Sequence, residues 1–139
     1  MPAASKTKRK TTERKTATTK TADFDKTFAA LKRLVTAHRA HTRVEIDQPG
    51  YYCTVSKLAT CRGKPLWFAG VRKGKAYVSF HLTPMYMCPE LAKGLSPELK
   101  KRRQGQGCFN FTSPDAKLFR ELAAVTKAGM EAYRKKKDF

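Results

Sequence analysis

Acidic side chains are scarce in this chain of 139 residues, which has 11 Asp and Glu against 30 Lys and Arg and a formal net charge of +19. Long apolar runs are also missing, because the longest, residues 66–71, falls far short of the roughly 18 residues that a membrane-spanning helix needs. The start of the chain shows no charged segment followed by an apolar core and a cleavage site. We therefore expect a cytoplasmic protein with no secretory signal and no membrane partner.

The shortage of carboxylates also limits the catalytic chemistry that the chain can support. Triad and paired-carboxylate mechanisms need an acid beside the reacting groups. The best single catalytic candidate is His81, and the nearest carboxylate in sequence belongs to Glu90. The alternative interpretation of His81 is a structural histidine, hydrogen-bonded between a sheet and the loop that follows it. We predict a binding protein rather than an enzyme, assign no catalytic residue and expect no cofactor.

Close-spaced cysteine pairs, which zinc sites usually use, are absent as well. The four cysteines are Cys53, Cys61, Cys88 and Cys108. Their wide spacing gives little support for a metal centre, and we interpret them as reduced structural thiols. The alternative is a metal site whose ligands would be His81, Cys88 and Cys108.

Positive charge is what the chain has in excess, and it falls in two parts. Residues 1–22 hold seven Lys and Arg and one Glu, with no Leu, Ile, Val or aromatic side chain, so we predict a disordered basic arm. We leave three interpretations of this arm open: a solubility tail, a segment that lies along phosphates, and a transit peptide. Residues 23–139 form the predicted domain and carry a net +13. An anionic partner, with nucleic acid as the leading candidate, explains such an excess.

The densest run of cations is followed by a glycine-rich segment, Gln-Gly-Gln-Gly, whose backbone N–H groups can approach an anion. A predicted hairpin supplies more cations. Together the candidate anion-binding residues are Arg72, Lys73, Lys75, Lys100, Lys101, Arg102 and Arg103. A solvated helix end is the alternative interpretation of the 100–103 run.

Aromatic and polar side chains supply candidates for a pocket or for base stacking, provided that their face of the sheet is open. They are Trp67, Tyr77, His81, Tyr86 and Asn110, with Tyr52 as a further stacking candidate. Burial in the core is the alternative for each aromatic ring. The sequence leaves the oligomeric state open.

Apolar periodicity predicts an α+β domain. Spacings of three and four residues indicate a helix from Asp23 to about Ala40 and another after Ser113-Pro-Asp115, while Ser96-Pro97 begins a shorter helix. Strands are predicted over 44–46, 51–56, 66–71, 76–82 and 108–111. We expect a two-layer sandwich in which an antiparallel sheet of about four or five strands carries the N- and C-terminal helices on one face. Whether residues 84–106 cover the other face stays open.

Alternation within the hairpin divides its side chains between two faces. Val78, Phe80 and Leu82 share one face, and Tyr77, Ser79 and His81 share the other. In the preceding strand, the pattern predicts Leu66 and Phe68 opposite Trp67 and Ala69.

Five segments give the chain a family resemblance. They are residues 75–82 (KAYVSFHL), 84–86 (PMY), 89–91 (PEL), 96–101 (SPELKK) and 107–111 (GCFNF). Through them, residues 24–133 resemble the YdhG-like family of small bacterial domains. The resemblance implies an α+β fold comparable to frataxin and, from one member described as an iron chaperone, an alternative role in iron or metal handling.

The carboxylates that such a role would use are Asp23, Asp25, Glu45 and Asp47, which lie among many cations. Iron held by oxygen ligands favours the opposite electrostatic field. A third alternative is a small-molecule-binding domain with its pocket around His81, Tyr86 and Asn110.

Overall fold

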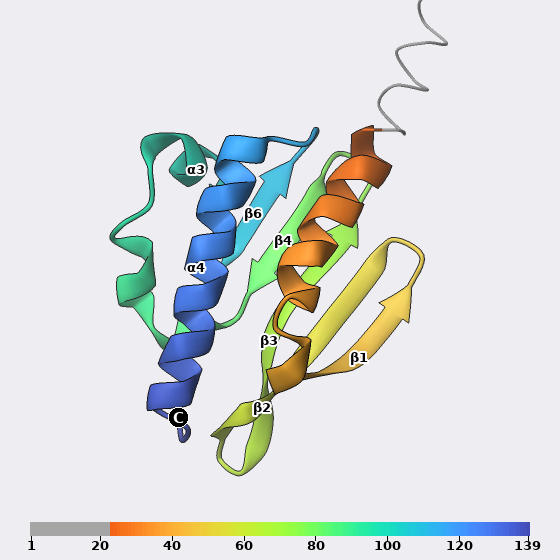
Figure 1. Ribbon diagram of the computed structural model, residues 1–139. Helices are drawn as coiled ribbons and strands as arrows, with labels where there is room; N and C mark the ends of the chain where they lie inside the picture. Colours follow the sequence, from red (N-terminus) through yellow and green to blue (C-terminus); the bar gives the residue numbers. More distant parts are fainter. Residues whose placement is uncertain (1–22) are drawn as a thin grey trace, which may run out of the picture.

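A six-stranded antiparallel sheet with helices on one face makes up the part of the chain that the computed structural model describes, residues 23–139 (Figure 1). The predicted basic arm, residues 1–22, lies outside the described residues. The first helix, residues 23–36, and the long α4 (Ala116–Lys135) lie on the same side of the sheet. This arrangement confirms the predicted two-layer α+β sandwich.

The strand order is β1-β2-β3-β4-β6-β5. Their bounds are β1 (Thr42–Gln48), β2 (Tyr51–Cys61), β3 (Lys64–Lys73), β4 (Val78–Leu82), β5 (Arg103–Gln104) and β6 (Cys108–Phe111). All five predicted strands are present. The sixth, β5, has two residues, too few for alternation to reveal it. Gly50, with φ of 77°, and Gly63, with φ of 80°, provide the left-handed backbone that the two tight β1–β2 and β2–β3 turns require.

The predicted Ser96 cap is present at α3 (Pro97–Arg102), whereas α4 is capped by Asp115, two residues after the predicted start at Ser113. The Ser96 hydroxyl accepts a hydrogen bond from the Leu99 N–H at 3.2 Å, and the Asp115 carboxylate accepts one from the Leu118 N–H at 3.0 Å. Each bond satisfies one of the N–H groups that a helix start leaves without an intrahelical partner. Two shorter elements, α2 (Pro84–Met87) and the 3-10 helix η2 (Pro89–Ala92), precede α3.

The first helix ends at residue 36, so the predicted end near Ala40 is wrong. Its last turn tightens, because the His38 N–H donates to the Val35 carbonyl at 3.1 Å and the His41 N–H donates to the His38 carbonyl at 3.0 Å. These three-residue bonds lead into the 3-10 helix η1 (Arg39–His41). The His38 ring meets the Phe68 ring edge to face, with ring centres 5.4 Å apart, so packing on the sheet turns the chain here.

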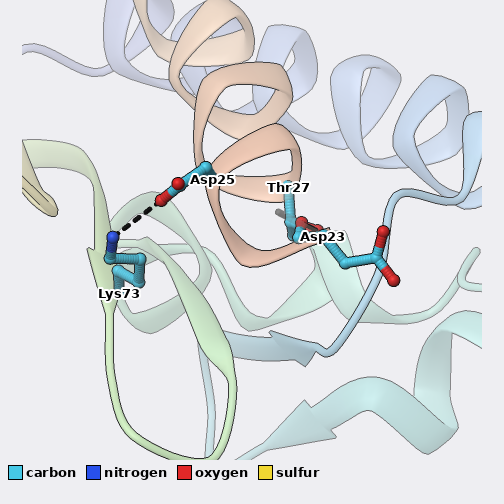
Figure 2. A network of polar contacts seen from close by, with 4 residues as sticks. All are labelled: Asp23, Asp25, Thr27 and Lys73. Atoms are coloured by element: carbon cyan, nitrogen blue, oxygen red, sulfur yellow. Dashed lines mark hydrogen bonds and ion pairs between the residues drawn. The ribbon is translucent and has the colours of Figure 1, made fainter. Parts of the chain in front are cut away.

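The core fills the space between the sheet and the two long helices. Its largest fully buried side chains include Phe68, Phe80, Phe109 and Phe111 from the sheet, and Leu31, Leu122 and Tyr133 from the helices. An ion pair between Lys73 Nζ and Asp25 Oδ1, 2.7 Å apart, joins β3 to the first helix at the edge of this core (Figure 2).

The segment between β4 and β6 packs beside α4, at the left of Figure 1, and not on the far side of the sheet. Glu121 of α4 holds it, because its carboxylate accepts hydrogen bonds from the Ser96 N–H at 2.7 Å and from the Ser96 hydroxyl at 2.6 Å. Within residues 23–139, the far face of the sheet therefore stays without a covering helix. We call it the uncovered face.

The structure decides the open alternative for Tyr52 in favour of burial and corrects the face assigned to Ala69. Tyr52 is buried in the core, and its neighbour Tyr51 reaches the uncovered face instead. Ala69 shares the core face with Phe68 because the β2–β3 register shifts, with Thr54 opposite Ala69 and Val55 opposite Trp67. This bulge leaves Phe68 as the extra residue and interrupts strict alternation.

None of the helices in residues 23–139 combines the length and the apolar character needed to cross a bilayer.

Candidate site on the uncovered face of the sheet

Strand register places two rows of side chains across the uncovered face. The first row runs from Tyr51 through Arg72 and Ser79 to Asn110, and the second runs from Cys53 through Gly70 and His81 to Cys108. Residues opposite each other on neighbouring strands project from the same face of a sheet. Segments far apart in the sequence therefore form one surface.

Trp67 projects from β3 on the same face and is 45% exposed. It lies beside a hollow of about 370 Å³ that is lined by Tyr51, Cys53, Trp67, Ala69, Gly70, Arg72, His81 and Thr83. We call this the aromatic hollow. It brings together two of the predicted stacking candidates, Trp67 and His81, with one of the predicted anion-binding residues, Arg72.

Gly70 forms the floor of the aromatic hollow. A Cβ atom at this position would collide with Cys53 Sγ and lie 3.2 Å from the Tyr52 carbonyl oxygen, so the thiol occupies the place of a side chain. Burial raises the pKa of the Cys53 thiol. Cys53 is therefore a neutral apolar surface at the bottom of the hollow.

Arg72 and Tyr51 form one wall of the hollow. The Arg72 guanidinium carbon lies 5.5 Å from the centre of the Tyr51 ring, a cation–π arrangement. A hydrogen bond to Cys53 raises the pKa of the Tyr51 hydroxyl, so it stays protonated. Since the guanidinium is held over a ring and still exposed, it can meet a phosphate while the ring meets an apolar surface.

His81 lines the hollow from the neighbouring strand. Desolvation by the groups around it, followed by the positive charge of Arg72, lowers the pKa of the imidazole below its ordinary value. The ring is therefore neutral near pH 7 and can serve as a flat stacking surface with one donor and one acceptor nitrogen. These properties make the hollow a place for a planar group carrying an adjacent negative charge.

A second group of polar side chains lies next to the hollow, on β4, β5 and β6. The Ser79 hydroxyl donates to Asn110 Oδ1 at 2.7 Å, the Cys108 thiol donates to the same oxygen at 3.6 Å, and Asn110 Nδ2 donates to Gln104 Oε1 at 2.6 Å. We call Ser79, Gln104, Cys108 and Asn110 the amide cluster. It contains the predicted pocket residue Asn110.

Two predicted pocket residues lie elsewhere. Tyr77 precedes β4 in the hairpin turn, where its carbonyl accepts from the Gly74 N–H at 2.9 Å. Tyr86 projects from α2, and its ring lies about where a side chain at Gly107 would be, with the nearest ring atom 2.9 Å from an ideal Cβ. Both rings are exposed, but neither lines the aromatic hollow.

The structure divides the predicted anion-binding residues among several surfaces. Arg72 faces the hollow, Lys75 lies in the exposed hairpin turn, and Lys73 is paired with Asp25. The Arg103 guanidinium donates to the Gln106 carbonyl at 3.0 and 2.8 Å, so it closes the glycine-rich loop.

The other cations of the 100–103 run, Lys100, Lys101 and Arg102, are exposed on α3. A hollow of about 450 Å³ beside α3 is lined by Glu98, Lys101, Arg102, Asp115, Lys117 and Leu118. Its two carboxylates offset part of the positive field of its three cations.

The metal-handling alternative finds little support in the geometry of residues 23–139, where no three His, Cys, Asp or Glu side chains gather as a ligand group. His81 and Cys108 are opposite each other on β4 and β6, whereas Cys88 lies beside α4 in a groove that also contains Glu90 and Lys136. Burial raises the pKa of both thiols, which favours the form that does not bind metals.

The carboxylates implied by the frataxin comparison are largely engaged with cations. Asp25 pairs with Lys73, Asp47 lies 3.6 Å from Lys32, and Glu45 lies 3.4 Å from Arg43. Each pairing reduces the negative field that an iron ion would require.

Sequence reasoning missed Tyr51 and Gln104. Tyr51 was hidden by the adjacent Tyr52, since a pair of tyrosines in a strand does not reveal which ring faces the core. Gln104 gave no signal other than its place in the glycine-rich segment, because β5 forms only through pairing with β6.

Searches of protein-family models, of curated proteins and of solved structures return no match to this chain.

Proposed function

We propose that this chain is a non-catalytic binding protein that holds single-stranded nucleic acid on the uncovered face of its sheet. The observation that carries the proposal is the half-exposed Trp67 beside Arg72 and His81 on a face that no described helix covers. Aromatic side chains on an open sheet stack unpaired bases, while cations beside them meet the phosphates. The net charge of +13 on residues 23–139 adds attraction for any polyanion.

Single strands fit this surface better than duplexes do. A duplex keeps its base faces stacked inside the helix, so rings that project from a flat sheet reach them only when the strands are apart. The hollow is shallow enough to be open along the face yet has a floor, at Gly70 and Cys53, on which a planar group can rest.

A cytoplasmic setting and the YdhG-like relationship are part of the same proposal. The four cysteines are free thiols in the structure, which agrees with a reducing compartment. The family relationship rests on the five sequence segments given above, and the two-layer fold agrees with it. It adds an expected fold and no activity.

The test is a fluorescence anisotropy titration of the full chain with a labelled single-stranded dodecamer and with the same sequence as a duplex. We expect tighter binding of the single strand, and Trp67→Ala should weaken it by about tenfold, since stacking on one aromatic side chain contributes ~1–3 kcal/mol. Because Trp67 is the only tryptophan, its own fluorescence should also change on binding.

Tyr77→Ala is the matched control, since Tyr77 is also an exposed aromatic residue of the hairpin but lies outside the hollow. Its affinity should remain within about twofold of the unaltered chain. Equal binding of duplex and single strand, together with equal effects of the two substitutions, would disprove the proposal.

A further inference from the structure

The amide cluster lies where a base next to the aromatic hollow would come to rest. Asn110 is opposite Ser79, which is opposite Arg72, and Cys108 is opposite His81. Neighbouring strands are about 4.8 Å apart, so the cluster lies roughly 10 Å across the sheet from β3. Trp67 lies three residues from Gly70 and five from Arg72 along β3, roughly 10–16 Å at about 3.3 Å per residue. A strand that stacks one base on Trp67 can therefore bring a base a few nucleotides further along over the cluster.

The amide cluster has unused hydrogen-bond donors that a base can meet. Asn110 Oδ1 accepts from the Ser79 hydroxyl and the Cys108 thiol, which uses both of its lone pairs. Asn110 Nδ2 donates one hydrogen to Gln104 Oε1 and keeps the other. Within residues 23–139, the Gln104 NH2 group has no hydrogen-bond partner, so two neighbouring amide nitrogens present N–H donors.

Neighbouring donors complement neighbouring acceptors. Guanine presents two acceptors on one edge, O6 and N7, whereas adenine presents N7 beside its N6 amino group, which is itself a donor. Against the amide cluster, adenine would therefore place a donor opposite a donor. Guanine would satisfy both amides at once.

We infer that the amide cluster selects bases with adjacent O6 and N7 acceptors, so that the chain prefers guanine-containing single strands to adenine-only strands. This inference rests on the proposed function, because the cluster can read a base only if a strand lies on the uncovered face. Arg72 and Trp67 would hold the strand, and Asn110 and Gln104 would distinguish its bases.

The experiment compares two labelled dodecamers by anisotropy with the full chain at pH 7.5. One is all adenine, and in the other four adenines are replaced by hypoxanthine, which has the O6 and N7 acceptors of guanine but no 2-amino group. We expect the second dodecamer to bind about fivefold more tightly, the low end of what a bidentate base contact contributes.

Two variants locate the source of the preference. Gln104→Met removes one amide from an exposed position and should reduce the fivefold ratio to about twofold or less. Gln48→Met is the matched control, since Gln48 is an exposed glutamine opposite Tyr51 at the other end of the first row. It should leave the ratio at about fivefold.

The possible results separate this inference from the proposed function. Equal affinities for the two dodecamers, or a preference for adenine, would overturn the inference and leave the proposed function standing. A preference that Gln104→Met does not change would also overturn it. Failure to bind either dodecamer would disprove the proposed function, and the inference would fall with it.

Discussion

His81 is the side chain whose protonation changes the charge of the aromatic hollow as the pH falls. Its pKa lies below the ordinary value because of desolvation and the charge of Arg72, and the other titratable groups around it are the Cys53 and Cys108 thiols and the Tyr51 hydroxyl, whose pKa values are raised. Those three stay neutral as the pH falls from 7.5. Protonation of His81 therefore adds the one new charge on this surface.

We predict that affinity for a single-stranded dodecamer rises by about two- to fivefold between pH 7.5 and pH 5, comparable to one exposed ion pair. A bound phosphate stabilises the protonated imidazole, so binding strengthens in the direction of lower pH. His81→Gln should remove this part of the pH dependence in anisotropy titrations.

The matched control is His38→Gln, because burial also lowers the pKa of His38 but its ring packs on Phe68 at the helix-covered face. This variant should keep the pH dependence of binding. Both histidines make the fold less stable as the pH falls through their ordinary pKa, so circular dichroism should verify folding at each pH. A pH response that His81→Gln leaves intact would contradict the assignment.

Individual residues of the site could be predicted only in part. Alternation predicts Trp67 and His81, because it separates them from the apolar residues of their strands, whereas Asn110 is named only as a polar residue of the candidate pocket. Tyr51 was missed in favour of Tyr52, since alternation says which residues share a face but not which face is buried. The bulge at Phe68 left no trace in the sequence, because it arises from pairing with a distant strand.

Among the elements, the irregular segment between β4 and β6 depends on one carboxylate of α4. Glu121 accepts two hydrogen bonds from Ser96, which is also the N-cap of α3. Hydrogen bonds to a charged acceptor contribute more than neutral ones, and removal of Glu121 would leave the half-buried Ser96 N–H with a weaker partner.

We predict that Glu121→Ala lowers the free energy of unfolding by about 1.5–3 kcal/mol, as measured by urea denaturation. Glu131→Ala is the control, because Glu131 lies on the same helix, is exposed and pairs with Arg134 at 3.4 Å. An exposed pair of this kind contributes less than about 1 kcal/mol. Similar values for the two variants would show that Glu121 does not hold the segment.

Elements with local signals were predicted well. Ser96 predicts the start of α3 through cap chemistry, Ser113-Pro-Asp115 predicts the start of α4 two residues early, and the central strands follow from alternation. The first helix was predicted four residues too long because His38 continues its apolar pattern, although the ring packs on Phe68 after the helix has ended. Packing between residues distant in the sequence determines where the first helix ends, and the local sequence pattern does not indicate this position.

At the scale of the whole described molecule, residues 23–139, the net charge of +13 does not act as one patch. Lys73 is neutralised by Asp25 on the helix side of β3, while Arg72, its neighbour in sequence, faces the hollow. Only cations that lie along a bound strand release counterions from its phosphates. Adjacent residues should therefore differ sharply in their effect on salt dependence.

We predict that Arg72→Gln makes the slope of log affinity against log salt less steep by about 0.7, the value for one phosphate of a single strand. Lys73→Gln, a substitution of the same charge one residue away, should leave the slope unchanged. Anisotropy titrations over a range of salt concentrations measure both. Equal changes in the two variants would show that binding follows total charge and not the uncovered face.

Within its five residues, β4 alternates between side chains that form the core and side chains that form the uncovered face. Val78, Phe80 and Leu82 are fully buried under the helices, whereas Ser79 and His81 belong to the exposed rows. Substitutions at Ser79 and His81 leave the buried core of the sheet unchanged. Natural variation or laboratory selection can therefore alter what this face binds without disrupting the fold.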